Sequence, residues 1–427
     1  MQYLIKLIKK TYQMAESDGS SMVMKNVVSL SQLQIISYVI PLIILPYLFR
    51  ILGAENFGLI SFAQAFVQYF IILTDYGFNV CATKEISLYR EDNIRVSRIH
   101  SAVMTIKTIL AFLSLIILLA IVSFIPKFKH DWLVYVLSFG AVVGNALFPL
   151  WYFQGTEKMK HIANFNILGA FIYALLILIF VRTPQDYVVV PLITSCVALT
   201  IGLWSQYFVF KEFGLPWNPP LYKDIINQFK AGWNIFISVV AINAYTTTRI
   251  FAVGLLTNNS LTGFYSIAER IANAVQTFPL SSFSQAIFPR LSKIYQKNKL
   301  KAFKIMQQIQ VITVWVSLIC LPIIFFFADF IVKIVCGGDY PAAVLSLRFL
   351  LVSVLFVASN AFRVQFFLVC GETKIYSKIH ITMATIGLPL IILLIYSFSY
   401  VGAAIATAII EAGTLTLTYF TLKKLKF

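Results

Sequence analysis

The stretch "GLISFAQAF" at residues 58–66 returns 205 positions later as "GFYSIAERI" at residues 263–271. Three residues are identical between the copies, and Gln64 corresponds to Glu269: Gly58, Ser61 and Ala63 match Gly263, Ser266 and Ala268. Each copy follows a short turn, "LGAEN" in the first and "LTNNS" in the second, and opens an apolar run. Because the copies hold the same place in the order of apolar runs, we interpret the chain as two repeated halves.

Composition places the chain in a membrane. Its 427 residues are 59% hydrophobic and 12% charged, with a mean hydropathy of +0.83. Soluble domains carry about 25% charged residues, so the apolar excess must face lipid. The net charge of +17 comes mostly from basic residues between apolar runs, where they set topology, and no motif for binding nucleic acid is present.

The apolar runs, each about 18–25 residues long, predict about twelve transmembrane helices in an all-α integral membrane fold. Their extents are 27–50, 57–80, 103–125, 132–153, 162–181, 187–209, 232–256, 261–287, 308–330, 341–369, 379–398 and 400–421. With the N-terminus inside, 25 of the 34 basic residues fall on inside segments and five on outside segments. This bias predicts that both termini are cytoplasmic.

The repeat and the spans together predict two parallel six-helix lobes around a central cavity, which is a transporter architecture. The loop "FGLPWNPPLYKD" (213–224) separates the halves, because its prolines and glycine mark a linker. We therefore expect an N-terminal cytoplasmic lead at 1–26, an N-lobe at 27–212, a cytoplasmic linker at 213–230 and a C-lobe at 231–427.

Four arginines lie within the predicted spans: Arg249, Arg270, Arg348 and Arg363. Ionisable groups at such depth usually face the bundle interior or a wet cavity. Arg270 lies near the middle of its span and cannot easily reach water, so it is the strongest candidate. Arg249 either lines the cavity or reaches the interface or an ion-pair partner. An arginine fork suits a diphosphate better than a lysine does.

Candidate site residues follow from this placement. We predict that the cavity binds the pyrophosphate and sugars of a substrate through Arg249, Arg270, Arg363, Asn273, Asn360 and Arg50. Candidates for coupling to an ion are the intramembrane acids Glu411, Glu269 and Asp75. Glu411 is equally compatible with a structural role, and Asp75 with a nearby Arg or Lys partner.

Motifs for enzyme chemistry are missing from the sequence. It contains no Walker A, GxSxG or HExxH pattern and no CxxC pair. We therefore expect no enzyme activity, no bound cofactor and no metal site.

Two segments resemble a known family. They are "LPYLFRILGAENFGLISFAQAFVQYFIILTDYGFNVCATKEISLYR" (45–90) and "TGFYSIAERIANAVQTFPLSSFSQAIFPRLSK" (262–293). Both resemble the Wzx-type O-antigen flippases, the polysaccharide-export branch of the multidrug/oligosaccharidyl-lipid/polysaccharide superfamily. The resemblance implies alternating access in the cytoplasmic (inner) membrane and transfer of a polyprenyl-pyrophosphate-linked oligosaccharide from the inner to the outer leaflet.

The expected partners are therefore this lipid-linked oligosaccharide, the bilayer and other polysaccharide-assembly membrane proteins. Ion coupling is expected, with the ion left open. Two alternatives remain: a cation-coupled multidrug exporter of the same superfamily and an integral membrane enzyme of polysaccharide biosynthesis. The exporter would be expected to use acids for cationic drugs, whereas intramembrane arginines suit an anion.

Overall fold

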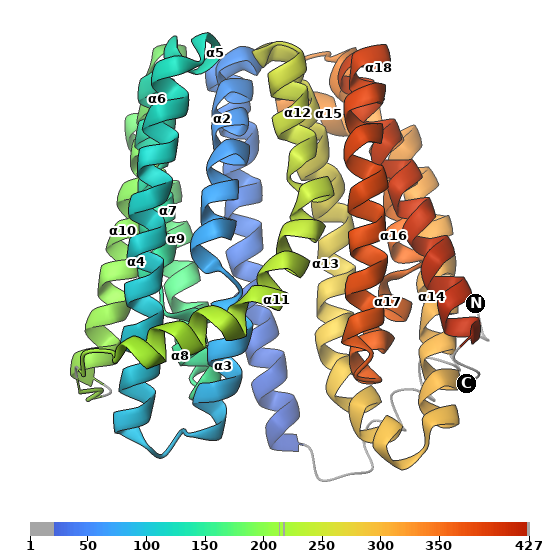
Figure 1. Cartoon of the computed structure of the whole chain (residues 1–427). Coiled ribbons are helices and arrows are strands. Elements are labelled where there is room, and N and C mark those ends of the chain that lie inside the picture. Colours follow the sequence, from blue (N-terminus) through green and yellow to red (C-terminus); the bar gives the residue numbers. More distant parts are fainter. Residues whose placement is uncertain (1–20, 213, 217, 425–427) are drawn as a thin grey trace.

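The computed structural model describes residues 21–212, 214–216 and 218–424, and helices make up most of them (Figure 1). These residues contain no strand, and nine of their helical stretches are long and apolar enough to cross a membrane. The predicted all-α membrane fold is therefore confirmed. The number of about twelve spans and the cytoplasmic termini stay predictions, and most of the predicted lead 1–26 lies outside the described residues.

The helices follow one another in a single order along the chain. The first are α2 (Ser21–Asp75), α3 (Phe78–Leu88), α4 (Asn93–Phe124), α5 (Pro126–Lys129), α6 (Trp132–Ser138), α7 (Gly140–Leu147), α8 (Leu150–Gly155), α9 (Met159–Phe180), η1 (Pro184–Val188), α10 (Val189–Tyr207) and η2 (Phe208–Glu212). The others are α11 (Tyr222–Thr246), α12 (Thr248–Leu256), α13 (Asn259–Lys297), α14 (Lys299–Phe326), α15 (Ala328–Cys336), α16 (Pro341–Ala358), α17 (Ala361–Val369) and α18 (Thr373–Lys424).

Two of the longest elements are each a pair of helices joined by a kink. α2 turns at Gly53, whose φ of 73° is a left-handed conformation that glycine adopts without a steric penalty. α18 turns at Ser399, with a φ of 54°. Both kinks fall in the gaps between predicted spans, 27–50 and 57–80 for the first and 379–398 and 400–421 for the second.

Five predicted spans are divided between separate α-helices in the structure. Span 57–80 is divided between α2 and α3, span 132–153 among α6, α7 and α8, span 232–256 between α11 and α12, span 308–330 between α14 and α15, and span 341–369 between α16 and α17. Hydrophobicity predicts where a span lies, but it does not register these local breaks in helix geometry.

The predicted linker also differs from the structure, because α11 starts inside it. The prolines of this segment end at Pro220. The Asp224 carboxylate then accepts a hydrogen bond from the backbone N–H of Leu221 at 3.2 Å and caps the new helix. The helical part of 213–230 therefore belongs to α11, while the predicted lobe bounds themselves stay a prediction.

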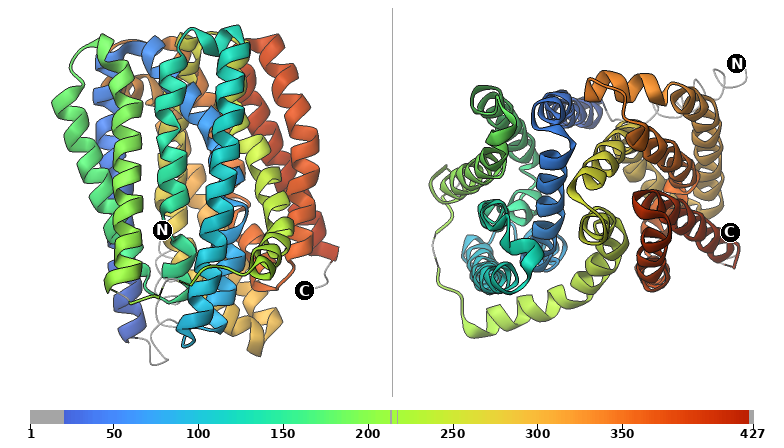
Figure 2. Two further views of the ribbon diagram at one scale, coloured as in Figure 1. Left: turned by 60° about the vertical axis from the view of Figure 1, so that its left-hand side comes forward. Right: turned by 90° about the horizontal axis from the view of Figure 1, so that it is seen from above.

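The helices form two groups joined by α11. Seen from above, α4, α6, α7, α9 and α10 gather on one side and α14, α16 and α18 on the other, with α2 and α13 between them (Figure 2). α11 runs across the lower end of the molecule and continues into α12, which rises to the upper end (Figure 1). The upper end corresponds to the predicted outside. It contains α5, the C-terminal end of α12 and α15, and these lie at or next to the predicted outside segments that follow spans 103–125, 232–256 and 308–330.

The two copies of the repeat are in direct contact, α2 against α13. A Cβ on Gly58 would lie 1.8 Å from the carbonyl oxygen of Asn259, and one on Gly263 would lie 2.0 Å from that of Ala54. Only glycine therefore allows these backbones to approach so closely, as small residues do at crossings of membrane helices. The Ser266 hydroxyl donates to the Ser61 hydroxyl at 3.0 Å, so the repeat seen in the sequence forms the contact between the halves.

A lysine from the first half caps a helix of the second at the upper end. The Lys127 ammonium donates to the carbonyl oxygens of Gly254, Leu255 and Thr257, the last two at 2.9 and 3.4 Å. These carbonyls lie at or just beyond the C-terminal end of α12, which carries partial negative charge. The contact therefore fastens α5 to α12 across the halves.

Replacing Lys127 with methionine is expected to loosen this end of the molecule. Loss of a cation from a helix C-terminus costs about 1 kcal/mol, which corresponds to a roughly fivefold higher population of the open form. Amide hydrogen exchange across residues 249–266 should rise by that factor. Lys129→Met is the matched control, because Lys129 is exposed, and equal exchange in the two variants would contradict the capping role.

Candidate functional site

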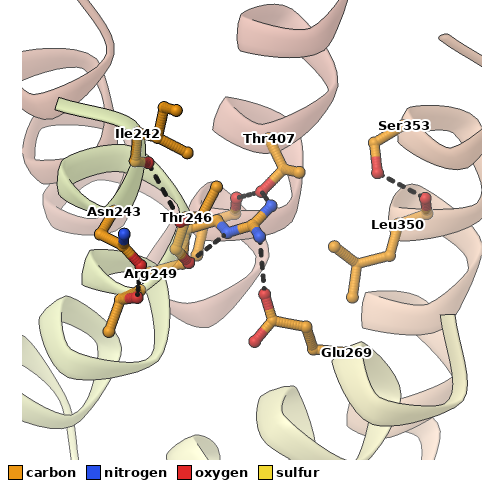
Figure 3. A network of polar contacts seen from close by, with 10 residues as sticks. Ile242, Asn243, Thr246, Arg249, Glu269, Leu350, Ser353 and Thr407 are labelled. Atoms are coloured by element: carbon orange, nitrogen blue, oxygen red, sulfur yellow. Dashed lines mark hydrogen bonds and ion pairs between the residues drawn. The ribbon is translucent and has the colours of Figure 1, made fainter. Parts of the chain in front are cut away.

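Arg249 on α12 lies at the centre of a polar network that also includes residues of α11, α13 and α18 (Figure 3). Its Nη2 forms an ion pair with Oε1 of Glu269 on α13 at 3.1 Å. Its Nη1 donates to the Thr407 hydroxyl on α18 at 3.2 Å, and its Nε donates to the carbonyl oxygen of Thr246 at 3.1 Å. Each of the three guanidinium nitrogens therefore has an oxygen partner (Figure 3).

The ion pair is almost completely shielded from solvent. The side chains of Arg249 and Glu269 are 12% and 6% exposed. A buried pair of this kind keeps its charges only because each partner compensates the other. The sequence left open whether Arg249 lines a cavity or pairs with an acid, and the structure pairs it with Glu269.

A second acid faces the same arginine. Glu411 lies four residues after Thr407 on α18 and is close enough to Arg249 for electrostatic attraction. Beside it, the Tyr245 hydroxyl and Nδ1 of His380 form a hydrogen bond at 2.8 Å. Arg249 is therefore ion-paired with Glu269 and attracted by Glu411 as well.

Arg270 has a different environment, although it is the next residue after Glu269. Its Nη2 donates to the side-chain carbonyl Oε1 of Gln64 on α2 at 2.7 Å. Its guanidinium carbon lies 5.5 Å from the centre of the Phe57 ring, a cation–π distance. Among the described residues no carboxylate forms an ion pair with Arg270. It lies about 16 Å along α13 from the first residue of that helix.

The other predicted residues of the second half lie elsewhere. Arg363 on α17 donates to the carbonyl oxygen of Ser359 at 3.0 Å and lies over the Tyr419 ring at 5.6 Å. Asn360 is buried and accepts a hydrogen bond from the Thr418 hydroxyl at 2.5 Å. Asn273 is exposed on α13. Arg363 and Asn360 thus surround the joint between α16 and α17, and no contact places them with Arg270.

Arg50 lies at the upper end of the first half. Its guanidinium donates to the carbonyl oxygens of Ile334 and Val335, the latter at 3.3 Å. These are among the last residues of α15, so Arg50 meets the negative end of a helix dipole. In this arrangement Arg50 resembles Lys127, because each reaches across to cap a helix of the second half.

Asp75, the third predicted coupling acid, is paired within the first half. Its Oδ1 lies 2.8 Å from Nζ of Lys107 on α4. Lys107 is 1% exposed, and its ammonium lies 4.7 Å from the centre of the Trp151 ring. Lys107 is thus the nearby basic partner that the sequence left open for Asp75, and its side chain is buried against this acid.

A cavity of about 320 Å³ lies where α3, α4 and α11 meet. Its charged and amide lining includes Glu85, Arg95, Arg98, Asp224 and Gln228. The Gln228 amide donates to the Glu85 carboxylate at 2.5 Å. Glu85, part of the family-like segment "ATKEI", therefore attaches α11 to the first half.

The structure brings together Arg249, Glu269, Arg270 and Glu411, and it keeps Arg50, Arg363, Asn360 and Asp75 apart from them. Sequence reasoning missed Gln64, Thr407 and His380. The repeat alignment already placed Gln64 opposite Glu269, which was the one available signal. No group of three or more His, Cys, Asp or Glu side chains among the described residues is arranged to hold a metal ion.

Comparison with known proteins provides an independent line of information. Residues 23–295 match the family described as "Polysaccharide biosynthesis protein". The chain is 33% identical over 392 residues to an Escherichia coli (strain K12) protein named "Putative O-antigen transporter", with 89% of this chain and 92% of that protein covered.

Two solved structures have a similar fold. One is the lipid II flippase MurJ in an inward closed conformation, with a TM-score of 0.76, 13% identity and coverage of 93% of this chain and 87% of that one. The other is the inward-facing conformation of a multidrug resistance MATE family transporter, with a TM-score of 0.73, 15% identity and coverage of 92% and 99%. At these identities the likeness concerns the fold.

Proposed function

The chain belongs to the polysaccharide biosynthesis protein family, and from this membership we propose that it is a flippase for a lipid-linked oligosaccharide. The substrate proposed is an oligosaccharide on polyprenyl pyrophosphate, such as an O-antigen repeat unit. It moves from the inner to the outer leaflet of the cytoplasmic membrane. The related Escherichia coli protein is named as an O-antigen transporter, and one protein of similar fold is named as a lipid II flippase.

One observation in the chain itself carries the choice of an anionic substrate. Arg270 is held in the interior by a neutral amide and an aromatic ring. A guanidinium without a carboxylate partner retains its attraction for an anion, and that attraction is strong where water is excluded. A pyrophosphate supplies two charges and several acceptor oxygens, while the polyprenyl tail stays in the lipid.

Alternating access needs an end that closes and opens. In the structure the upper end is held by the crossing of α2 and α13 and by Arg50 and Lys127, which cap α15 and α12. All of these contacts join the first half to the second. We propose that they form when the substrate path faces the cytoplasm and break when it faces the outer leaflet.

Ion coupling is proposed through the acids near Arg249. Arg249 is ion-paired with Glu269, and Glu411 faces the same guanidinium without an ion pair among the described residues. A proton or a metal cation could therefore bind at Glu411 and leave again during transport. The same acids are the feature that a multidrug exporter for cations would use, but the pairing of Glu269 with Arg249 supports the flippase over that alternative.

Deletion of the gene in its native organism, with complementation, tests the function. The deletion strain should lose surface polysaccharide and accumulate lipid-linked oligosaccharide on the inner leaflet, and the full-length gene should reverse both changes. Persistence of surface polysaccharide without such accumulation would refute the proposal.

The mass of the substrate distinguishes a flippase from an enzyme of polysaccharide biosynthesis. Purified full-length protein in vesicles should make lipid-linked oligosaccharide accessible on the opposite leaflet and leave its mass unchanged. A change in the mass of the sugar or the lipid would identify an enzyme instead.

A further inference from the structure

The crossing of α2 and α13 fixes which side chains of the two repeats face one another. Backbone contact at Gly58 and Gly263 and the hydrogen bond between Ser61 and Ser266 are symmetric about this crossing. Residues related by the repeat therefore occupy related positions on the two helices. One helical turn beyond each serine lies one polar residue, Gln64 on α2 and Glu269 on α13.

These related residues each accept from a different arginine. Glu269 Oε1 is paired with Nη2 of Arg249 at 3.1 Å, whereas Gln64 Oε1 accepts from Nη2 of Arg270 at 2.7 Å. The first acceptor carries a negative charge and the second is a neutral amide. The equivalent position in each half thus accepts a bond from an arginine. In the second half the acceptor neutralises the arginine's charge, and in the first half it does not.

The difference decides which arginine keeps its charge available. Arg249 is compensated by Glu269 and attracted by Glu411 as well. Glu269 also attracts Arg270 at longer range, but its ion pair is with Arg249. Within the described part of the chain, the Arg270 guanidinium bonds to the amide of Gln64 and lies over the face of Phe57, and both contacts orient a cation without cancelling its charge.

We propose that Gln64 determines specificity for an anion: it positions the Arg270 guanidinium through its carbonyl oxygen and, because it is neutral, leaves the charge of Arg270 for the pyrophosphate. The inference rests on the proposed flippase function and adds a residue from the opposite half to the binding site. It also assigns Arg249 a structural role. Arg270 contacts the substrate, and Gln64 acts through Arg270 as a positioning residue.

The test is a single change of charge, Gln64→Glu. A glutamate has nearly the same shape and would keep the hydrogen bond, but it would form a buried ion pair with Arg270. Purified full-length protein in nanodiscs is titrated with polyprenyl pyrophosphate and with polyprenyl monophosphate. Wild type should prefer the pyrophosphate, and Gln64→Glu should bind it at least about tenfold more weakly and lose the preference.

Two further variants exclude a merely structural effect. Gln68→Glu introduces the same charge one turn along the same helix, away from the bond with Arg270, and should keep the preference. Gln64→Leu removes the acceptor without adding charge, so it should weaken pyrophosphate binding less than Gln64→Glu does. Thermal unfolding of Gln64→Glu at or above the wild-type temperature would show that the loss is not caused by misfolding.

The outcomes separate this inference from the function on which it rests. If wild type binds the pyrophosphate and exports polysaccharide, and Gln64→Glu does so equally well, Gln64 does not determine specificity and the flippase function stands. If the wild-type protein shows no preference for the pyrophosphate and deletion of its gene leaves polysaccharide export intact, the proposed flippase function itself is wrong.

Discussion

Replacing Arg270 with alanine is expected to reduce polysaccharide export at least about tenfold. Hydrogen bonds to a charged group contribute about 1.5–3 kcal/mol each, and Arg270 is the interior guanidinium whose bonding partner in the structure is a neutral amide. Surface polysaccharide per cell, normalised to the amount of the protein in the membrane, measures the effect. Full export by Arg270→Ala at equal protein level would remove Arg270 from the substrate path.

Two further substitutions show whether the charge of Arg270, its planar fork or positive charge in general is needed for export. Arg270→Lys should restore part of the export, because it returns the charge but not the planar fork that binds two phosphate oxygens at once. Arg348→Ala is the matched control. Arg348 also lies in a predicted span, but its guanidinium pairs with Asp329 at 2.5 Å, and both side chains are partly exposed. A loss in Arg348→Ala as large as in Arg270→Ala would indicate a general need for positive charge.

The sequence predicts the main features of the fold because they depend on composition and repetition. Apolar runs place the helices, and glycine at position 53 lies in the gap where α2 turns. The repeat pairs Ser61 with Ser266, and the structure joins these two hydroxyls by a hydrogen bond. The ends of α7, α11 and α16 were not predicted, because hydrophobicity is continuous across those breaks.

The candidate site was predicted in part. Depth in the membrane singled out Arg249, Arg270, Glu269 and Glu411, and the structure groups them. The sequence could not show which acid pairs with which arginine, since Arg249 and Glu269 are on different helices. Glu269 and Arg270 are adjacent in the chain yet bond to partners on opposite halves. Lys107 shows the same limit, because its partner Asp75 comes from another helix.

The second large effect is expected when Arg249 is replaced by methionine. Breaking a buried ion pair by removing one partner costs about 3–5 kcal/mol, because the other charge is left uncompensated. Arg249→Met removes the cation from two carboxylates at once, Glu269 at 3.1 Å and the more distant Glu411. The free energy of unfolding of the purified protein in detergent should fall by this amount, and less folded protein should reach the membrane.

Glu269→Gln should cost less than Arg249→Met, because Glu411 still faces the arginine in that variant. The double variant Arg249→Met/Glu269→Gln removes both charges of the pair and should recover most of the lost stability. If Arg249 only holds the helices together, the double variant should also regain binding of polyprenyl pyrophosphate, since Arg270 and Gln64 are untouched. Recovery of stability without recovery of this binding would instead place Arg249 in contact with the substrate and contradict the structural role that its pairing with Glu269 indicates.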